Sequence, residues 1–144
     1  MSTPSRSSHI CQQLAITLFY LMTFALGARV KWLDLHPAWF EAQFKSTWLA
    51  HLPGGLGSVY FSLALIETIV GLGFLVSLLK AEPFNGRNVW LKLSLNGSLF
   101  IFLILAYGSR LTEKYDVAGW NFLYFVGTLL IAWHIQSQTH NEKS

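Results

Sequence analysis

The chain alternates between four long apolar segments and shorter polar connections. The apolar segments cover residues 10–30, 56–79, 89–107 and 117–135. Each has about the 20 residues that a helix needs to cross roughly 30 Å of hydrocarbon. Such segments must be helical, because lipid offers no hydrogen-bond partner to the backbone. The pattern therefore predicts an all-α membrane protein with four transmembrane helices in an antiparallel bundle.

Polar ends flank this apolar region. Residues 1–9, MSTPSRSSH, are rich in Ser and predict a disordered tail, and residues 137–144 predict a polar C-terminal tail. Residues 10–136 form a single predicted transmembrane domain. An alternative interpretation takes LAITLFYLMTFALGA as the apolar core of a signal peptide that would end near residue 28. A retained first helix is simpler, because the rest of the chain is already embedded in the membrane.

The connection between the first two apolar segments is long and aromatic. Phe40, Phe44 and Trp48 recur every four residues, so they would share one face of a helix. Pro37 suits a first helical turn, and the LPGG sequence at Pro53 ends the element. We expect a short amphipathic helix at the headgroup level, where Trp is favoured. The residues of this candidate partner surface are Trp32, Trp39, Phe40, Phe44 and Trp48. The later connections, KAEPFNGRN and GSRLTEKYD, predict a plain turn and a short charged loop.

Composition supports the membrane assignment. Charged residues make up 12% of the chain, against roughly 25% in soluble domains. The single cysteine, Cys11, excludes an internal disulfide and a dithiol redox cycle. No basic run alternates with aromatic residues, so the expected partner is the lipid bilayer and not a nucleic acid.

Charge gives little guidance on orientation. Four crossings place both termini on one side, and Lys and Arg divide five to five between the two sides. Two acidic residues, Glu82 and Glu142, lie on the side of the termini and four lie on the other side. This distribution favours cytoplasmic termini.

One charge interrupts the second apolar segment. Glu67 stands alone in SLALIETIVGLGFLVSLL, about twelve residues from either end of the helix. A charged residue at the bilayer centre costs about 3 kcal/mol on insertion scales, so the carboxylate needs a proton, a partner or a wet cavity. Ala64 and Gly71 share its helical face, and small residues mark close helix approaches. We therefore expect Glu67 to point into the bundle.

Other polar residues are candidate neighbours of Glu67. Thr23, Gly27 and Lys31 recur every four residues and form a narrow stripe that ends in a cation. The third and fourth segments contribute an Asn, a Tyr and a Thr. The predicted polar cluster consists of Lys31, Glu67, Asn96, Tyr124 and Thr128. It is either interhelical hydrogen bonding that fixes register, or a proton-accepting or quinone-headgroup site in which Glu67 titrates.

Three stretches resemble the DoxX-like family of small four-helix membrane proteins. GARVKWLDLHPAWFEAQFKSTWLAHLP resembles the first half of the family, ALIETIVGLGFLVSLL its second helix and GWNFLYFVGTLLIAW its last helix. The resemblance covers about residues 14–136. Its main matches are Gly27, Lys31, Phe44, Glu67, Gly71, Gly119 and Trp120. By position, Lys31 and Glu67 would match the polar pair of the family.

The resemblance implies a location and a role. The location is a bacterial cytoplasmic membrane. The wider family includes DoxD-like subunits of thiosulfate:quinone oxidoreductase and MauE-like proteins that help to mature a periplasmic amine dehydrogenase. The implied role is an accessory or maturation subunit with a redox enzyme as partner. The alternatives are a quinone-interacting oxidoreductase subunit that uses Glu67 and Lys31, and a small-solute or proton conduit. A stand-alone enzyme is not expected, because no complete acid–base–nucleophile set is visible.

Histidines do not predict a haem or metal site. Haem binding between helices needs axial ligands at matching depth. His134 falls at the end of the last apolar segment, whereas His36 and His51 fall in the first connection, on the other side of the membrane. His36 and His51 together lack a third ligand.

Overall fold

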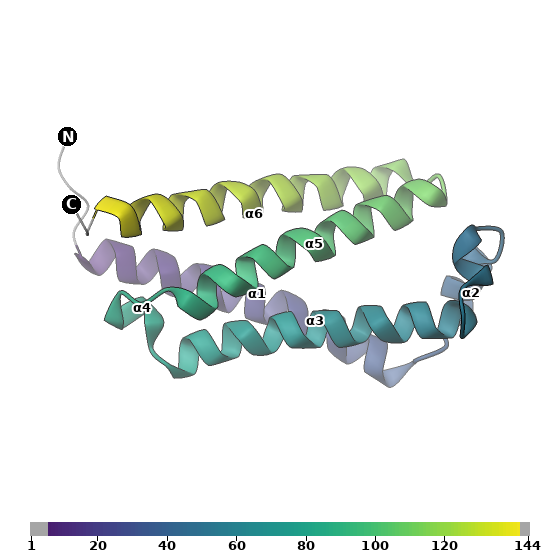
Figure 1. Ribbon diagram of the computed structural model, residues 1–144, viewed down its shortest axis with the longest axis horizontal. Helices are drawn as coiled ribbons and strands as arrows, with labels where there is room; N and C mark the ends of the chain where they lie inside the picture. The colour runs from purple at the N-terminus through teal and green to yellow at the C-terminus, as the bar shows by residue number, and fades with distance from the viewer. Residues whose placement is uncertain (1–5, 142–144) are drawn as a thin grey trace.

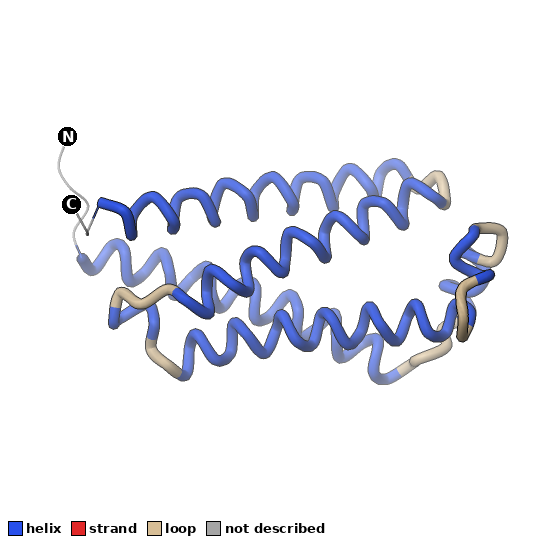
Figure 2. Tube along the Cα trace, viewed as in Figure 1, coloured by secondary structure: helices blue, strands red, loops and turns tan. Residues whose placement is uncertain are grey.

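The computed structural model describes residues 6–141, which contain helices and turns but no strand (Figure 2). Four of the helices are long and apolar enough to cross a membrane: α1, α3, α5 and α6. The predicted fold class is therefore confirmed, and the chain is a multi-pass integral membrane protein. In chain order the elements are α1 (Arg6–Leu33), α2 (Ala38–Phe44), the 3-10 helix η1 (Trp48–His51), α3 (Gly55–Leu79), α4 (Glu82–Asn85), α5 (Val89–Leu111) and α6 (Tyr115–Asn141).

The long helices run side by side as a bundle with two different ends (Figure 1). The most extensive helix contacts join α1 to α3 and α5 to α6, and α3 also contacts α5. The start of α1, the end of α6 and the short α4 lie at one end of the bundle, called here the α4 end. The α2–η1 connection and the α5–α6 turn lie at the other end, called here the α2 end.

The outer helices extend further than the apolar pattern predicted. The first helix begins at Arg6, so residues 6–9 are helical and not part of a tail, while residues 1–5 lie outside the described range. The last helix continues to Asn141, so most of the expected C-terminal tail is helical as well, and residues 142–144 lie outside the description. No Pro or Gly interrupts these polar turns, so the membrane helices propagate into them.

Aromatic rings fill the centre of the bundle. The ring of Phe74 in α3 stacks on Tyr20 and Phe24 of α1, with centroids 5.2 and 6.1 Å away. Phe24 also contacts Phe102 of α5 at 5.9 Å. Gly71 permits this approach, because a Cβ there would lie 3.3 Å from the Cβ of Phe24. The outer surface is rich in exposed large hydrophobic side chains, as expected for a surface in contact with lipid.

The α2–η1 connection covers the α2 end of the bundle. Phe40 and Phe44 are each only 6% exposed and pack on Tyr60 near the start of α3. The ring of Phe44 also reaches α5, where it lies 3.6 Å from the Cβ position of Gly108. Gln43 Nε2 donates to Thr112 Oγ1 at 2.9 Å. The connection is therefore fastened to both α3 and α5.

The partner surface predicted from spacing needs correction. The α2 helix ends at Phe44, so Trp48 belongs to η1 and does not continue the face formed by Phe40 and Phe44. Those two phenylalanines face the bundle because Tyr60 and Gly108 give them an apolar seat, so they are not surface residues. The three indoles at positions 32, 39 and 48 are 42%, 59% and 53% exposed. The predicted break is confirmed: Gly54 and Gly55 have φ of 84° and 63°, which favours glycine.

Candidate functional site

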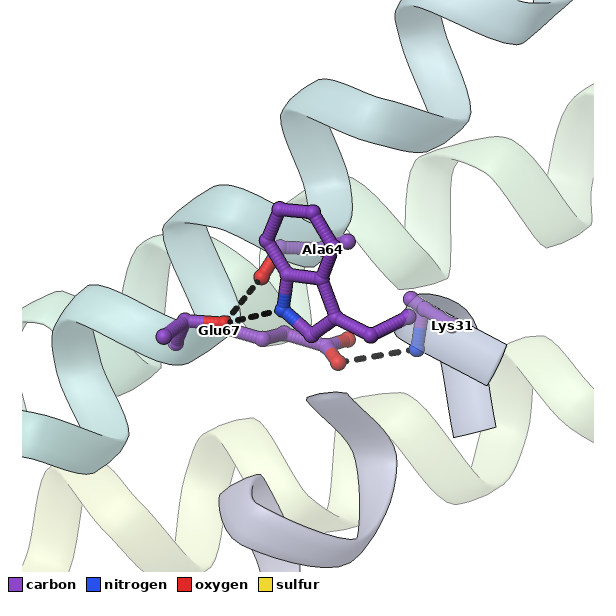
Figure 3. Close-up of polar contacts among 5 residues, drawn as sticks. Lys31, Ala64 and Glu67 are labelled. Atoms are coloured by element: carbon purple, nitrogen blue, oxygen red, sulfur yellow. Dashed lines mark hydrogen bonds and ion pairs between the residues drawn. The ribbon is translucent and has the colours of Figure 1, made fainter. Parts of the chain in front are cut away.

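Lys31 and Glu67 form a buried ion pair between α1 and α3 (Figure 3). Lys31 Nζ donates to Glu67 Oε2 at 2.8 Å. Lys31 comes from the last turn of α1, and Glu67 from the middle of α3. The side chain of Glu67 is 5% exposed and that of Lys31 is 16% exposed. The pair that the sequence predicted is thus formed, and its lysine side chain is less completely buried than its carboxylate.

Gly27 makes room for the pair. A Cβ at position 27 would lie 3.0 Å from Glu67 Oε2 and 4.0 Å from Lys31 Nζ. Any larger residue would press on the carboxylate, so the predicted Gly27–Lys31 stripe has a direct steric meaning. Thr23 in the same stripe does not join the site, because its hydroxyl donates to the Phe19 carbonyl of its own helix.

A second polar link lies beside the ion pair (Figure 3). Trp32 Nε1 donates to Thr68 Oγ1 at 2.9 Å, and that hydroxyl donates to the Ala64 carbonyl at 2.7 Å. The Trp32 ring also meets Phe61 edge to face, with centroids 5.5 Å apart. Two consecutive residues of α1 therefore hold two consecutive residues of α3. Sequence reasoning missed Thr68, because a Thr in an apolar helix usually bonds only to its own backbone.

The rest of the predicted cluster does not reach Glu67. Thr128 is fully buried in α6, but its hydroxyl shares a 2.7 Å hydrogen bond with the hydroxyl of Tyr20. Tyr124 is half exposed and stacks on Phe102, with centroids 5.5 Å apart. Asn96 is exposed on α5, whose buried face is formed by Ser94, Leu95 and Ser98. The predicted cluster thus divides into an α1–α3 ion pair and a separate α1–α6 hydroxyl contact.

A second buried carboxylate was not anticipated. Glu82 is 3% exposed, and its oxygens accept hydrogen bonds from Ser77 Oγ at 2.8 Å, Trp90 N at 3.0 Å and Leu91 N at 2.9 Å. The two backbone donors belong to the first turn of α5, so Glu82 caps that helix from α4. The prediction of a plain turn between α3 and α5 was wrong.

Asn88 precedes α5 at the position that normally supplies the cap. Its side chain is buried, and its Oδ1 has no hydrogen-bond partner among the described residues. The reason is that Glu82 already occupies the amides of Trp90 and Leu91. The sequence does not show that Glu82 replaces Asn88 as the cap, since an Asn directly before an apolar helix predicts an ordinary cap.

The ion pair is the arrangement in this structure that is best suited to bind a ligand. A carboxylate and an ammonium in contact inside a low-dielectric bundle attract strongly, but both have lost their hydration. A ligand that offers a carbonyl oxygen to Lys31, or a proton to Glu67, could therefore compete with the pair. Within residues 6–141, no three His, Cys, Asp or Glu side chains are grouped so as to hold a metal ion.

Comparison with protein-family models, with curated proteins and with solved structures finds no match for this chain. The fold and the site together define a class: a multi-pass membrane protein of four long helices with a buried Lys–Glu pair between the first and the second. The resemblance to the DoxX-like family stays a prediction that rests on the sequence stretches themselves.

Proposed function

We propose that this protein is a DoxX-like accessory subunit of a redox system in a bacterial cytoplasmic membrane. In this role the α2 end docks a partner enzyme through Trp39 and Trp48. One observation carries the proposal: these two exposed indoles stand on a connection that is fastened to the bundle by Phe40, Phe44 and Gln43. Trp side chains held in a fixed position dominate many protein interfaces, because little conformational entropy is lost on binding.

The proposed orientation places both termini in the cytoplasm. Lys and Arg divide five to five between the two sides, so the positive-inside rule does not choose between the orientations. The proposal rests on the acidic residues of the connections and tails, of which two lie on the α4 side and four on the α2 side.

Site-specific photo-crosslinking tests the docking role. A photoreactive amino acid at position 39 or 48 is expected to give one discrete adduct with a redox-enzyme subunit in native membranes. The same group at Trp133, which is 69% exposed on α6, serves as the lipid-facing control and should give none. Equal adducts at all three positions, or none at positions 39 and 48, would contradict the proposal.

A second candidate function is a quinone site at the ion pair. It is favoured by the partial exposure of Lys31 beside the Trp32 indole, which offers a donor and a flat ring at one place. Lys31 would donate a hydrogen bond to a quinone carbonyl oxygen, and Glu67 would hold a proton. A bound quinone would supply two-electron, two-proton redox chemistry at this position.

Glu67→Gln separates the quinone site from a structural pair. The amide keeps the shape of the side chain but cannot hold the proton. In lipid nanodiscs, a quinone site predicts at least a tenfold loss of affinity for a ubiquinone analogue, or about 1.4 kcal/mol, measured at a temperature where both proteins remain folded. Lost stability without quinone binding by either protein would instead identify a purely structural pair.

A further inference from the structure

An open depression lies at the α2 end of the bundle, between α2 and the turn that joins α5 to α6. Its volume is about 670 Å³. Its lining comes from two segments of the chain that are distant in sequence: α2 and the turn between α5 and α6. The lining residues are Trp39, Ala42, Gln43, Thr112 and Lys114. Neither the ion pair nor the Glu82 cap contributes to it.

The lining contains hydrogen-bond donors that are not taken up by contacts within the depression itself. Lys114 is exposed, and the one ion pair found in the described part of the chain joins two other residues, Lys31 and Glu67. Gln43 Nε2 donates one hydrogen to Thr112 Oγ1, and its second hydrogen can bond to a ligand. Trp39 is 59% exposed, and its indole N–H is a further donor. A surplus of donors around one cation suits a ligand that consists of acceptor oxygens.

The backbone places Lys114 at this position. Glu113 N donates to the Arg110 carbonyl at 3.1 Å, and Lys114 N donates to the Ser109 carbonyl at 2.9 Å. These two bonds form a Schellman motif, which closes α5 and turns the chain toward α6. The motif needs a left-handed residue, and Glu113 takes that role with φ of 58°. The flanking carboxylates Glu113 and Asp116 are not among the residues that line the depression.

The surroundings match the headgroup level of a membrane. The Arg110 guanidinium lies over the Tyr115 ring at 5.2 Å, directly beside the turn. Trp39 is exposed on the other wall. Cations, Tyr and Trp concentrate where hydrocarbon gives way to phosphate groups, so we expect the depression to open at that depth.

We propose that this depression binds a phosphate group, with Lys114 as its charged contact and the amide of Gln43 as a donor. An anionic phospholipid and soluble phosphate share this chemistry. The proposal does not rest on partner docking, although Trp39 serves both. The test therefore alters Lys114 and leaves the indole in place.

The experiment measures lipid retained by the purified protein in nanodiscs that contain phosphatidylcholine with phosphatidylglycerol. Native mass spectrometry should show selective retention of phosphatidylglycerol, and Lys114→Gln should reduce it at least fivefold. The matched control is Lys45→Gln, an exposed cation at the same end that does not line the depression. It should retain the lipid as the wild type does.

A second arm identifies the source of the phosphate. Inorganic phosphate is titrated against the protein in nanodiscs of phosphatidylcholine alone, and Trp fluorescence is followed. Saturable binding that Lys114→Gln abolishes would support a site for soluble phosphate. Retention and binding that are unchanged in Lys114→Gln, or reduced equally in Lys45→Gln, would overturn the proposal.

Discussion

Two buried glutamates of this protein satisfy their charge in opposite ways. Glu67 and Glu82 are 4% and 3% exposed, so neither carboxylate is hydrated to any useful extent. Glu67 meets a side-chain cation from another helix, whereas Glu82 accepts from a hydroxyl and from two backbone amides at a helix N-terminus. Equal burial therefore does not imply an equal role.

The difference lies in which partner can leave. Lys31 has a flexible stem and can turn away from Glu67 toward the bundle surface. The amides of Trp90 and Leu91 are fixed by the helix that they begin, so the bonds to Glu82 persist as long as α5 does. An ion pair between side chains suits a functional site, and a carboxylate held by backbone donors suits a structural joint.

The largest expected effect comes from removing one half of the ion pair. Lys31→Met should destabilise the protein by about 3–5 kcal/mol, because it leaves an uncompensated buried carboxylate. The measurement is reversible unfolding in mild detergent, followed by circular dichroism. The double variant Lys31→Met/Glu67→Met should recover most of the loss, since it removes both charges. Additive losses in the double variant would show that the two charges do not depend on each other.

Removing the capping carboxylate should cost less. Glu82→Ala is expected to destabilise by about 2–3 kcal/mol, because one hydroxyl and two amides lose a charged acceptor. Asn88 can then turn to the freed amides and limit the loss. Hydrogen exchange should quicken in the first turn of α5 and not in α1. Glu41→Ala, which removes an exposed acidic side chain, should stay within about 0.5 kcal/mol.

The space around Glu67 gives the next prediction. Gly27→Ala is expected to cost about 1–3 kcal/mol, because its Cβ would crowd Glu67 Oε2. Gly119→Ala in α6 meets nothing within 4 Å and should be neutral or slightly stabilising. Thermal unfolding of the two variants in one detergent compares them directly. Similar stability of the two variants would mean that Glu67 can move away from the new Cβ at position 27 without loss of stability.

The smallest expected change in stability comes from Glu113, an exposed glutamate that serves as the reference for the two buried ones. Glu113 has φ of 58°, a conformation that a side chain disfavours and glycine accepts. Glu113→Gly should therefore stabilise the protein by about 0.5–1 kcal/mol. Glu113→Gln keeps the strain and should leave the melting temperature unchanged. A loss of stability in both variants would reveal a role for this carboxylate that its exposure does not suggest.

The features predicted correctly from the sequence are those that can be read from the residue pattern of a single helix. Apolar length determines the four crossings, and a single charge in an apolar segment marks Glu67. The Gly27–Lys31 stripe could be seen because small and cationic residues share one face. Asn96 and Tyr124 were misplaced because the rotation of each helix about its axis depends on the packing of all four. Spacing does not determine that rotation.

Two further errors have different physical causes. An amphipathic segment shows which residues are apolar but not whether they face lipid or protein, so Phe40 and Phe44 were assigned to the surface. The partners of Glu82 include two backbone amides, and backbone donors leave no trace in residue type. Sequence reasoning recovered interactions between side chains better than interactions with the main chain.

The ion pair also bears on the order in which the protein can be assembled during synthesis. Lys31 and Glu67 are 36 residues apart, so α1 is synthesised before its counter-charge in α3. Until α3 is made, the ammonium group of Lys31 must stay near the membrane surface, where it can be hydrated. The arrival of α3 allows both charges to enter the bilayer together. We therefore expect α1 and α3 to associate first, so that α5 and α6 join a pair of helices whose two buried charges already match.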